Sequence, residues 1–399
     1  MTGTKSLGRP GWSVRHRYLS GILVALCTIV VAVLAIELFF FYVLGIRCPG
    51  YRPDRFMQFS PMTGAIHKPN AQGYWYRYND GSKFYVSINS HGFSDSERSL
   101  EKTRPRIALI GDSTTEFWEA EPEYRGQYVL EEMLDGLFEV LNFGVRGYAT
   151  DQVYILFENV VTDFAPDIVI YTLCVNDIAN NALTKGKPYF VIDSDNPDRL
   201  LLRNFPAKRE PATREDNPKL RAIDDFLKAK SFLYRKSRGL LKGLISYRYP
   251  LKTHFELRPY LKTYDDEDRR RMDICLRLIR DLKMSVEERG MRFLLVEGIY
   301  RPVLDEEMRD RLVKVYGDIF DFSRLTRTLK AYSSEQGIEF LSLSEIASDK
   351  GIDALELMHS EDNMHLDRRG IHLFAASVAG RLRELGWLEE PLNHQRRQL

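Results

Sequence analysis

The stretch Ile107-Ala-Leu-Ile-Gly-Asp-Ser113 decides how the central part of the chain folds. Four consecutive apolar residues are typical of a strand that is buried on both faces of a sheet. Gly111 permits a tight turn directly after it, and Asp112 can bind nearby backbone amides and hold that turn. Ser113 would then begin the next element with its hydroxyl pointing into a cleft. Taken alone, this tripeptide is also compatible with an ordinary turn and an N-cap serine.

Short apolar strands and helical patterns alternate from this stretch to the C-terminal region. The expected strands are 107–110, 138–142, 167–173, 292–296 and 338–343, and the expected helices are 123–137, 150–162, 265–289, 304–334 and 367–385. Such alternation is typical of a parallel sheet with helices on both faces. Five strands predict an α/β fold with a flavodoxin-like doubly wound sheet, whose sites lie at the carboxyl ends of the strands.

Two segments lie outside this alternation. Residues 47–105 read as an irregular extension with one hairpin about the turn Asn79-Asp80-Gly81. Residues 180–264 are rich in proline, and we interpret them as an insertion after the third strand that forms a lid or subdomain. Its part 228–262 holds ten basic residues and one acid. This part is either a basic amphipathic lid for an anionic membrane or glycan, or a surface helix that packs on the core.

The N-terminal region predicts a membrane anchor. Residues 19–46 are apolar except for Glu37, and this run is long enough to cross the hydrocarbon core of a bilayer. Four basic residues and no acid precede this run, which favours a cytoplasmic segment 1–18 and an exported remainder. A cleaved signal peptide is the rival interpretation, but the run is too long and no small-x-small site follows it. We expect Glu37 to lie near the helix end or to be protonated.

The charge balance and the cysteine content exclude several classes of protein. The chain has 399 residues with 57 Lys and Arg, 56 Asp and Glu, and a net charge of +1. A nucleic-acid-binding protein is usually strongly basic, and four cysteines do not make a disulfide scaffold. Residues 1–50 carry a net +4, so the other residues sum to −3. The basic excess therefore belongs to the N-terminal leader, and the exported part is slightly acidic.

Two further segments offer hydrogen-bond donors at strand ends. Asn142-Phe-Gly-Val-Arg-Gly147 follows the second strand, and its glycines expose backbone N–H groups. Cys174-Val-Asn-Asp177 follows the third strand and places the Asn176 amide there. Acyl transfer needs such donors where the tetrahedral oxygen becomes negative. Either segment alone is more simply a turn.

A histidine with a nearby acid precedes the last helix. His365 can take the proton of Ser113, and Asp362, three residues earlier, can orient the imidazole through its other nitrogen. None of the other seven histidines has an acid at this spacing between a strand and a helix. No metal-ligand spacing, phosphate loop or dinucleotide glycine pattern is visible, so we predict that the protein needs no cofactor and no metal.

Together these pieces resemble the SGNH/GDSL hydrolase superfamily of serine esterases, which is named for four sequence blocks. In the family's order, the matching pieces are Gly111-Asp112-Ser113, the segment ending at Gly147, Asn176 with Asp177, and Asp362 with His365. The resemblance implies a Ser113–His365–Asp362 triad. It also implies an oxyanion hole of the Ser113 amide, the Gly147 N–H and the Asn176 side chain, supported by Gly111, Asp112 and Asp177.

The resemblance covers residues 106–388 without the insertion, and it has one departure. The family's first block often continues to a small glycine, whereas here Phe117 and Trp118 follow, which puts the shape of the acyl pocket in question. The remaining residues 389–399 form a C-terminal tail. Cys174 and Cys275 are expected to be buried thiols.

The sequence therefore predicts an N-in, single-pass inner-membrane protein with an extracytoplasmic, periplasmic serine ester hydrolase domain. The expected substrates are O-acyl esters, in the first place O-acetyl esters, of envelope or exported polysaccharide. One alternative is a polysaccharide O-acyltransferase that uses the same residues. Another is a non-catalytic glycan-binding or assembly factor on the same fold, and a phospholipid or thioester substrate also stays open. Neither the oligomeric state nor any protein partner follows from the sequence.

Overall fold

The computed structural model describes residues 12–43, 56–76, 82–209, 255–359 and 363–389, together with 223–224, 226–227, 231, 233–234, 237 and 391. The chain divides into two units, which we describe separately. One comprises Met1–Tyr51 and Pro218–Gly243, and the other comprises Arg52–Asn217 and Leu244–Leu399. The second unit contains every strand of the described residues.

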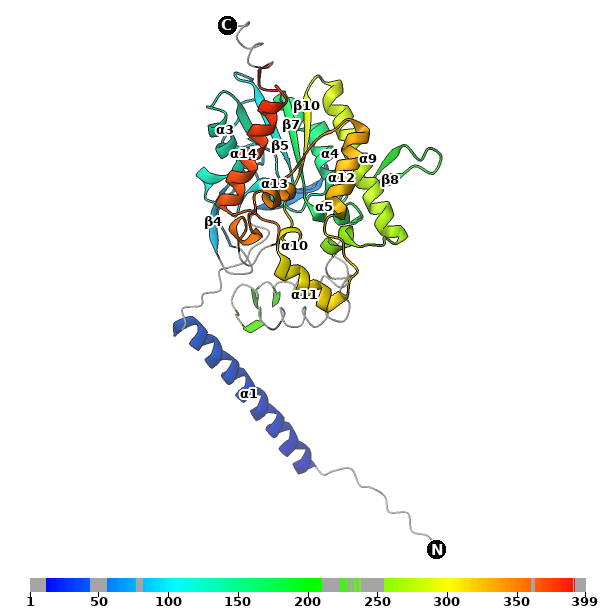
Figure 1. Cartoon of the computed structure of the whole chain (residues 1–399). Helices are drawn as coiled ribbons and strands as arrows, with labels where there is room; N and C mark the ends of the chain where they lie inside the picture. The colour runs from blue at the N-terminus through cyan, green and yellow to red at the C-terminus, as the bar shows by residue number, and fades with distance from the viewer. Residues whose placement is uncertain are drawn as a thin grey trace. The chain divides into compact units, whose positions relative to one another are not determined.

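A five-stranded parallel sheet forms the centre of the second unit (Figure 1). In sheet order its strands are β11 (Glu339–Ser342), β10 (Arg292–Glu297), β7 (Ile168–Leu173), β5 (Arg106–Gly111) and β6 (Glu139–Asn142). Numbered along the chain and read from the β6 edge, this order is 2-1-3-4-5, which is the flavodoxin-like doubly wound order. The predicted fold class and the five predicted strands are confirmed. Because the order reverses beside β5, the ends of β5, β6 and β7 meet at the switch point, where sites lie in such folds.

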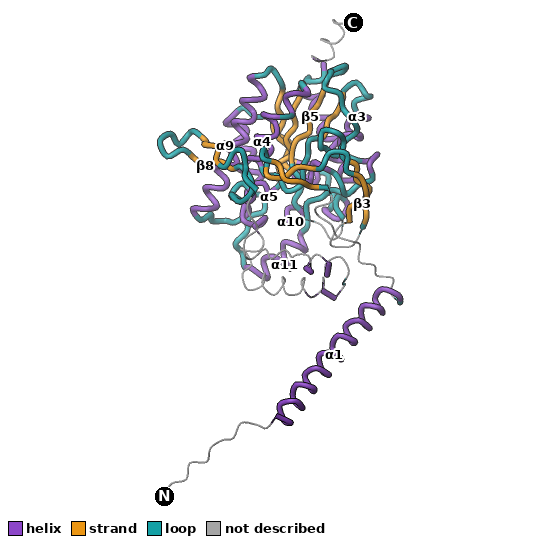
Figure 2. Tube along the Cα trace, turned by 180° about the vertical axis from the view of Figure 1, so that it is seen from behind, coloured by secondary structure: helices purple, strands orange, loops and turns teal. Residues whose placement is uncertain are grey.

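Helices cover both faces of the sheet, so the unit has three layers (Figures 1 and 2). One face carries α4 (Thr150–Asn159), α9 (Asp266–Glu288) and α12 (Arg324–Gln336), and the other carries α3 (Gly126–Met133), α13 (Leu343–Asp349) and α14 (Arg368–Glu384). Short elements complete the unit: α2 (Ser113–Glu116), α5 (Val175–Asn180), α10 (Arg301–Leu304), α11 (Glu306–Tyr316), η2 (Pro122–Tyr124), η3 (Val161–Phe164), η4 (Phe255–Tyr260) and η5 (Ala354–Glu356).

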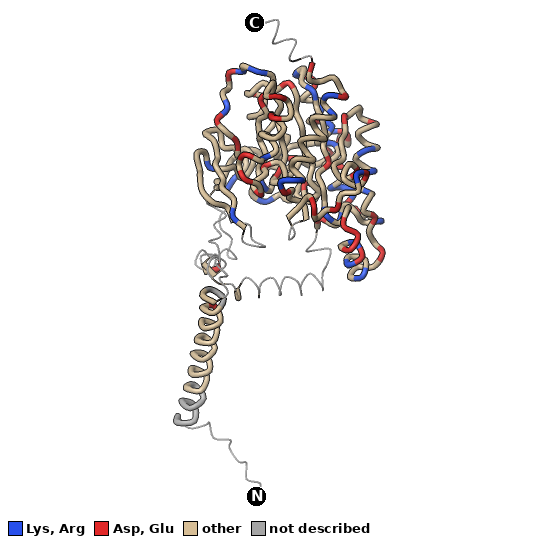
Figure 3. Tube along the Cα trace, turned by 60° about the vertical axis from the view of Figure 1, so that its left-hand side comes forward, with Lys and Arg blue, Asp and Glu red and all other residues tan. Residues whose placement is uncertain are grey.

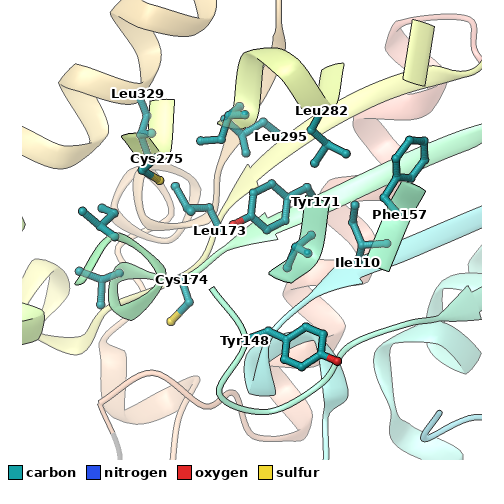
Figure 4. Close-up of a cluster of buried hydrophobic side chains, with 14 of the residues drawn as sticks. Ile110, Tyr148, Phe157, Tyr171, Leu173, Cys174, Cys275, Leu282, Leu295 and Leu329 are labelled. Carbon is teal, nitrogen blue, oxygen red and sulfur yellow. The ribbon is translucent and has the colours of Figure 1, made fainter. Parts of the chain in front are cut away.

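Alternate residues of each central strand enter opposite cores. In β5, Ala108 and Ile110 pack under α4 and α9, whereas Ile107 and Leu109 pack under α3 and α14. All four are fully buried, as expected of a parallel strand that is covered on both faces. Figure 4 shows the first of these cores, in which Cys275 and Cys174 lie among aliphatic and aromatic side chains. Both cysteines are free and buried, as the sequence predicted.

The predicted helices differ from the observed ones at two places. The region 304–334 contains α11 and α12 instead of one helix, and α11 ends at Gly317, which has a φ of +79° that a helix does not accept. The region 123–137 contains η2 and the shorter α3, which ends before the left-handed residues Asp135 and Gly136. In both regions the hydrophobic residues keep a helical spacing beyond the end of the helix, and only the backbone dihedral angles show where the helix ends.

Three antiparallel hairpins surround the central sheet. In the N-terminal extension, β1 (Met57–Ser60) pairs with β2 (Gly64–His67), and β3 (Gln72–Tyr76) pairs with β4 (Lys83–Ser87). The second pair is the predicted hairpin, although its turn 79–81 lies outside the described residues. In the insertion, β8 (Tyr189–Ile192) pairs with β9 (Leu200–Arg203). Most of the basic part 228–262 lies outside the described residues, so its role stays a prediction.

The first unit contains the helix α1 (Trp12–Tyr42). Its segment Ser20–Phe39 is long and apolar enough to cross a membrane, and Figure 3 shows this helix almost free of charged residues. Glu37 is the acid near its end, and its carboxylate accepts hydrogen bonds from the Ser231 hydroxyl and from the Leu233 N–H at 2.9 Å. Within this unit, the anchor helix is therefore joined to part of the insertion.

Candidate active site

Ser113 begins α2 directly after β5, at the carboxyl end of the strand. Asp112 is the N-cap of this helix, and its carboxylate accepts from the Thr114 N–H and hydroxyl, each at 2.8 Å. A Cβ on Gly111 would lie 2.2 Å from the Thr115 hydroxyl oxygen, so only glycine fits this turn. The turn thus presents a half-buried serine at the sheet edge, with the hydroxyl available to a ligand.

His365 lies beside Ser113 although 252 residues separate them in the chain. Its Nε2 atom is 2.9 Å from the Ser113 Oγ, which is hydrogen-bond distance. The loop that carries His365 is fixed where the Asn363 carbonyl accepts from the Arg301 N–H at 2.7 Å. It is fixed again where Asp367 caps α14. Asp362 lies outside the described residues, so its assignment as the orienting acid stays a prediction.

Asn176 joins the turn of Asp112 and Ser113 to the end of the third strand. It lies in the first turn of α5, and its Nδ2 donates to the Asp112 Oδ2 at 3.0 Å. The Ser113 hydroxyl lies 3.5 Å from the same oxygen. An amide nitrogen carries two hydrogens, so one remains for a ligand beside Ser113. The structure thus brings Asp112, Ser113 and Asn176 together.

Gly147 ends a loop that follows β6 and packs on α2. Its φ of +77° lies in the left-handed region that favours glycine, and open space surrounds it. Within the described part of the chain, its N–H donates to no protein acceptor. Earlier in the loop, a Cβ on Gly144 would lie 2.6 Å from the Glu116 nitrogen, so the loop and α2 are in close contact. The Gly147 N–H is therefore available to a ligand at this edge.

Asp177 and Cys174 support the site from beneath. The Asp177 Oδ2 accepts from the Tyr171 hydroxyl at 2.9 Å and from the Cys174 N–H at 3.2 Å. Burial, with the neighbouring Asp112 charge, raises the pKa of Asp177 well above its usual value. Burial and the same charge also raise the pKa of the Cys174 thiol. A protonated thiol is a poor nucleophile, so Cys174 is a buried thiol of low reactivity.

The two bulky residues of the first block pack away from each other into separate cores. Phe117 has a φ of +54° and its ring lies 5.4 Å from that of Phe374 on α14. Trp118 is 1 % exposed and packs with Phe56, Val86 and Ile88 of the N-terminal extension. Both rings are therefore part of the protein interior.

An ionic cluster beside the site escaped the sequence analysis. It consists of His67, Glu116 and Arg146, which come from β2, α2 and the loop of Gly147. Burial acts to raise the pKa of Glu116, but the Arg146 charge and the His67 hydrogen bond outweigh it and hold that pKa below its usual value. Glu119 is also near, with a carboxylate oxygen 4.0 Å from the His365 Nε2. Burial, which the sequence does not reveal, is the signal that singles out these residues.

Among the described residues, no three His, Cys, Asp or Glu side chains gather as a metal ion requires. The groups at this edge are a hydroxyl from Ser113, an imidazole from His365 and N–H donors from Asn176 and Gly147. A serine next to an imidazole can be activated for nucleophilic attack, and nearby N–H groups can stabilise a developing oxyanion.

Comparisons with known proteins find likeness only among solved structures. No family model and no curated protein matches the chain. An acetylxylan esterase from Geobacillus stearothermophilus, solved as a catalytic mutant, is 16% identical over 72% of this chain and 98% of its own, with a TM-score of 0.37. A GDSL-like lipase from Bacteroides thetaiotaomicron VPI-5482 is 10% identical over 72% and 93%, with a TM-score of 0.36. Each likeness is distant, so we base the proposed function on the geometry of the site.

Proposed function

We propose that the protein is a serine ester hydrolase of the SGNH/GDSL type. One observation carries the proposal, namely the 2.9 Å hydrogen bond between the Ser113 Oγ and the His365 Nε2 at the carboxyl edge of a doubly wound sheet. The N–H groups of Gly147 and Asn176 come from the segments that follow β6 and β7, the two strands on either side of β5. The proposed site thus combines a nucleophile, a base and oxyanion donors, which are the parts that acyl transfer requires.

The reaction begins when the Ser113 Oγ attacks the ester carbonyl carbon. His365 takes the hydroxyl proton through its Nε2, and the carbonyl oxygen becomes an oxyanion that accepts from the Gly147 N–H, the Asn176 Nδ2 and the Ser113 N–H. His365 then returns the proton to the leaving alkoxide, which departs as an alcohol and leaves an acyl-enzyme. Water attacks the acyl-enzyme with His365 again as base, which releases the acid and restores Ser113.

We further propose that the substrate is an O-acyl ester, in the first place an O-acetyl ester, of an extracytoplasmic polysaccharide. The apolar helix Ser20–Phe39 supports a single-pass anchor, and the basic residues before it support an N-terminus in the cytoplasm. An enzyme held there by one helix meets envelope or exported glycans as they pass. The substrate class thus rests on the resemblance and on the location.

Hydrolysis of p-nitrophenyl acetate and of longer acyl esters by the purified full chain tests the chemistry. We expect turnover by the wild type and a loss of at least about 1,000-fold in Ser113→Ala, because the nucleophile is essential to the covalent route. A fluorophosphonate should label Ser113. Equal turnover in both proteins, or labelling at another residue, would refute the proposal.

Acceptor sugars distinguish the hydrolase from an O-acyltransferase, since both use the same residues. The assay is repeated with xylo-oligosaccharide in excess, and the products are separated by mass. We expect free acetate as the main product. Acetylated sugar in larger amount than acetate would assign the transferase function.

A further inference from the structure

The carboxylate of Glu116 is the centre of a buried ionic cluster next to the oxyanion loop. Glu116 lies in the same short helix as Ser113, three residues later, and it is fully buried. Its Oε1 accepts from the His67 Nε2 at 2.6 Å and from the Arg146 backbone N–H at 3.2 Å. Its Oε2 accepts from the Arg146 Nε at 2.9 Å and lies 2.8 Å from the Nη2. One carboxylate thus holds both the main chain and the side chain of Arg146.

Arg146 is held on its other side by aromatic rings. Its guanidinium carbon lies 3.9 Å from the ring centroid of Trp118 and 4.6 Å from that of Trp75. Cation–π contacts at such distances are attractive, and here they add to the ion pair. Arg146 is therefore fixed in position, and the next residue in the chain is Gly147.

Gly147 needs such a constraint because it is exposed and its own N–H has no acceptor among the described residues. Its φ is +77°, no heavy atom lies close to where a Cβ would be, and glycine is the residue with the widest choice of backbone conformations. A donor in an oxyanion hole works only if it already points to the developing charge. We use the word clamp for the four side chains that hold Arg146, directly or through Glu116, namely those of Glu116, His67, Trp75 and Trp118. This clamp on Arg146 restricts the peptide that carries the Gly147 N–H.

The N-terminal extension supplies two parts of the clamp. His67 comes from β2, and its Nδ1 lies 3.1 Å from the Gly92 carbonyl oxygen, so an acceptor faces each ring nitrogen. Such a ring donates to both acceptors when both nitrogens carry a proton. Trp75 comes from β3. The extension, the nucleophile helix and the oxyanion loop therefore meet at one carboxylate.

We propose that Glu116 is a positioning residue of the oxyanion hole, which acts through Arg146 on the Gly147 N–H and is held in turn by His67 of the extension. This inference rests on the proposed function, because it assumes that Gly147 binds an oxyanion. Glu116 itself does not touch the substrate. The extension is thus a part of the catalytic apparatus, although it precedes the sheet in the chain.

The test compares Glu116→Gln with a matched variant, Glu139→Gln. The glutamine side chain in Glu116→Gln keeps the shape but loses the charge and turns a donor toward Arg146 or His67. Glu139 also pairs with a buried arginine, Arg106 at 2.7 Å, but at the amino end of β6, away from the site. For Glu116→Gln we expect kcat for p-nitrophenyl acetate to fall about 10- to 100-fold with KM changed less than about 3-fold, since a displaced oxyanion donor affects the transition state. For Glu139→Gln we expect an unchanged kcat.

A boronic acid that forms a tetrahedral adduct on Ser113 separates positioning from misfolding. Its inhibition constant, measured on the fraction of sites that a fluorophosphonate titrates, should rise in Glu116→Gln by the same factor as kcat falls. An unchanged constant, or a kcat no lower than that of Glu139→Gln, would overturn the inference. If Glu116→Gln does not fold, Arg146→Lys replaces it, because Arg146 is partly exposed and lysine keeps one donor to Glu116. For Arg146→Lys we expect a smaller loss of kcat, about 3- to 10-fold. An unchanged inhibition constant, or a kcat no lower than that of Glu139→Gln, would again overturn the inference.

The two proposals fail in different ways. If Ser113→Ala hydrolyses as fast as the wild type, or no fluorophosphonate reaches Ser113, the proposed function fails and the inference fails with it. If the wild type depends on Ser113 and Glu116→Gln retains its full kcat, the hydrolase stands and only the inference falls.

Discussion

The amide nitrogen of Asn176 donates to the Asp112 carboxylate across 3.0 Å and so ties the end of β7 to the turn that carries Ser113, the proposed nucleophile. This hydrogen bond orients the amide, because the Asn176 Oδ1 is buried without a partner among the described residues and the nitrogen is the anchored atom. Because the amide group is planar, this hydrogen bond also fixes the direction of the second hydrogen on the same nitrogen. Asp112 thus serves two purposes, as the N-cap of α2 and as the partner that orients Asn176, the proposed oxyanion donor.

Asn176→Ala should therefore abolish most of the activity. We expect kcat to fall about 100-fold or more, because one oxyanion donor is lost, and stability to fall by about 1 kcal/mol, because Asp112 loses a partner. Steady-state kinetics and thermal unfolding measure the two effects. Asn180→Ala, at the end of the same helix, is the control and should retain activity. A kcat within 3-fold of the wild type in Asn176→Ala would exclude the amide from the oxyanion hole.

Gly147→Ala should separate catalysis from backbone strain. A side chain at φ +77° costs about 1–2 kcal/mol, although open space surrounds the position. Gly290 is a matched control, since its φ is +74° and it too has open space, but it lies after α9 at the amino end of β10. Both alanine variants should unfold at similarly lowered temperatures, and only Gly147→Ala should lose kcat. Because alanine keeps the backbone N–H, only a change in its direction can lower kcat, and equal kcat in the two variants would contradict a catalytic role for the left-handed conformation of Gly147.

The orientation of the anchor is open to a direct test. Alkaline phosphatase folds to an active enzyme only where its disulfides form, outside the cytoplasm. A fusion after residue 60 should therefore be active, and a β-galactosidase fusion at the same position should be inactive. The physical reason for this expectation is the cluster of basic residues before Ser20, since basic residues next to a membrane span tend to stay in the cytoplasm. An inactive phosphatase fusion would place the hydrolase domain in the cytoplasm.

The sheet and the nucleophile turn were predictable from the sequence because their signals are local. Ile107–Ile110 is a short apolar run with glycine, aspartate and serine after it, and the topology of parallel sheets brings the ends of such strands together. The same rule predicted that residues after the other strands would lie beside this turn. The side chains of Ser113 and Asn176 lie where that rule expects them.

The ionic cluster was not predictable, because nothing local marks its members. His67 and Glu116 are 49 residues apart and lie in different parts of the fold, and each resembles an ordinary surface residue in the sequence. Both are fully buried in the folded protein, where His67 of the extension meets Glu116 of α2. The break between α11 and α12 escaped for a related reason, since a hydrophobic pattern of helical period does not report the φ of one glycine.

Glu297 predicts how stability depends on pH. It ends β10, where its carboxyl accepts from the Thr326 hydroxyl at 2.8 Å and the Ser342 hydroxyl at 2.6 Å. Burial raises the pKa of Glu297 from 4.5 to about 7, although the two hydroxyls act against it. The folded protein therefore binds this proton more tightly than the unfolded chain. The stabilising effect is complete below pH 4.5 and is lost as pH rises to about 7, by about 3 kcal/mol.

Glu297→Gln removes this titration and keeps the shape and a hydrogen-bonding group. Its free energy of unfolding should therefore fall less between pH 5 and pH 8 than that of the wild type. Denaturant unfolding at both pH values measures the difference, which should change by up to about 3 kcal/mol in favour of the variant. Glu335→Gln, on the exposed side of α12, is the control and should follow the wild type at both pH values. The other buried acids, such as Asp177, titrate alike in all three proteins, so they cancel in the comparison. A difference that is the same at pH 5 and pH 8 would mean that Glu297 is already ionised when buried, with its two hydroxyl donors sufficient to hold the charge.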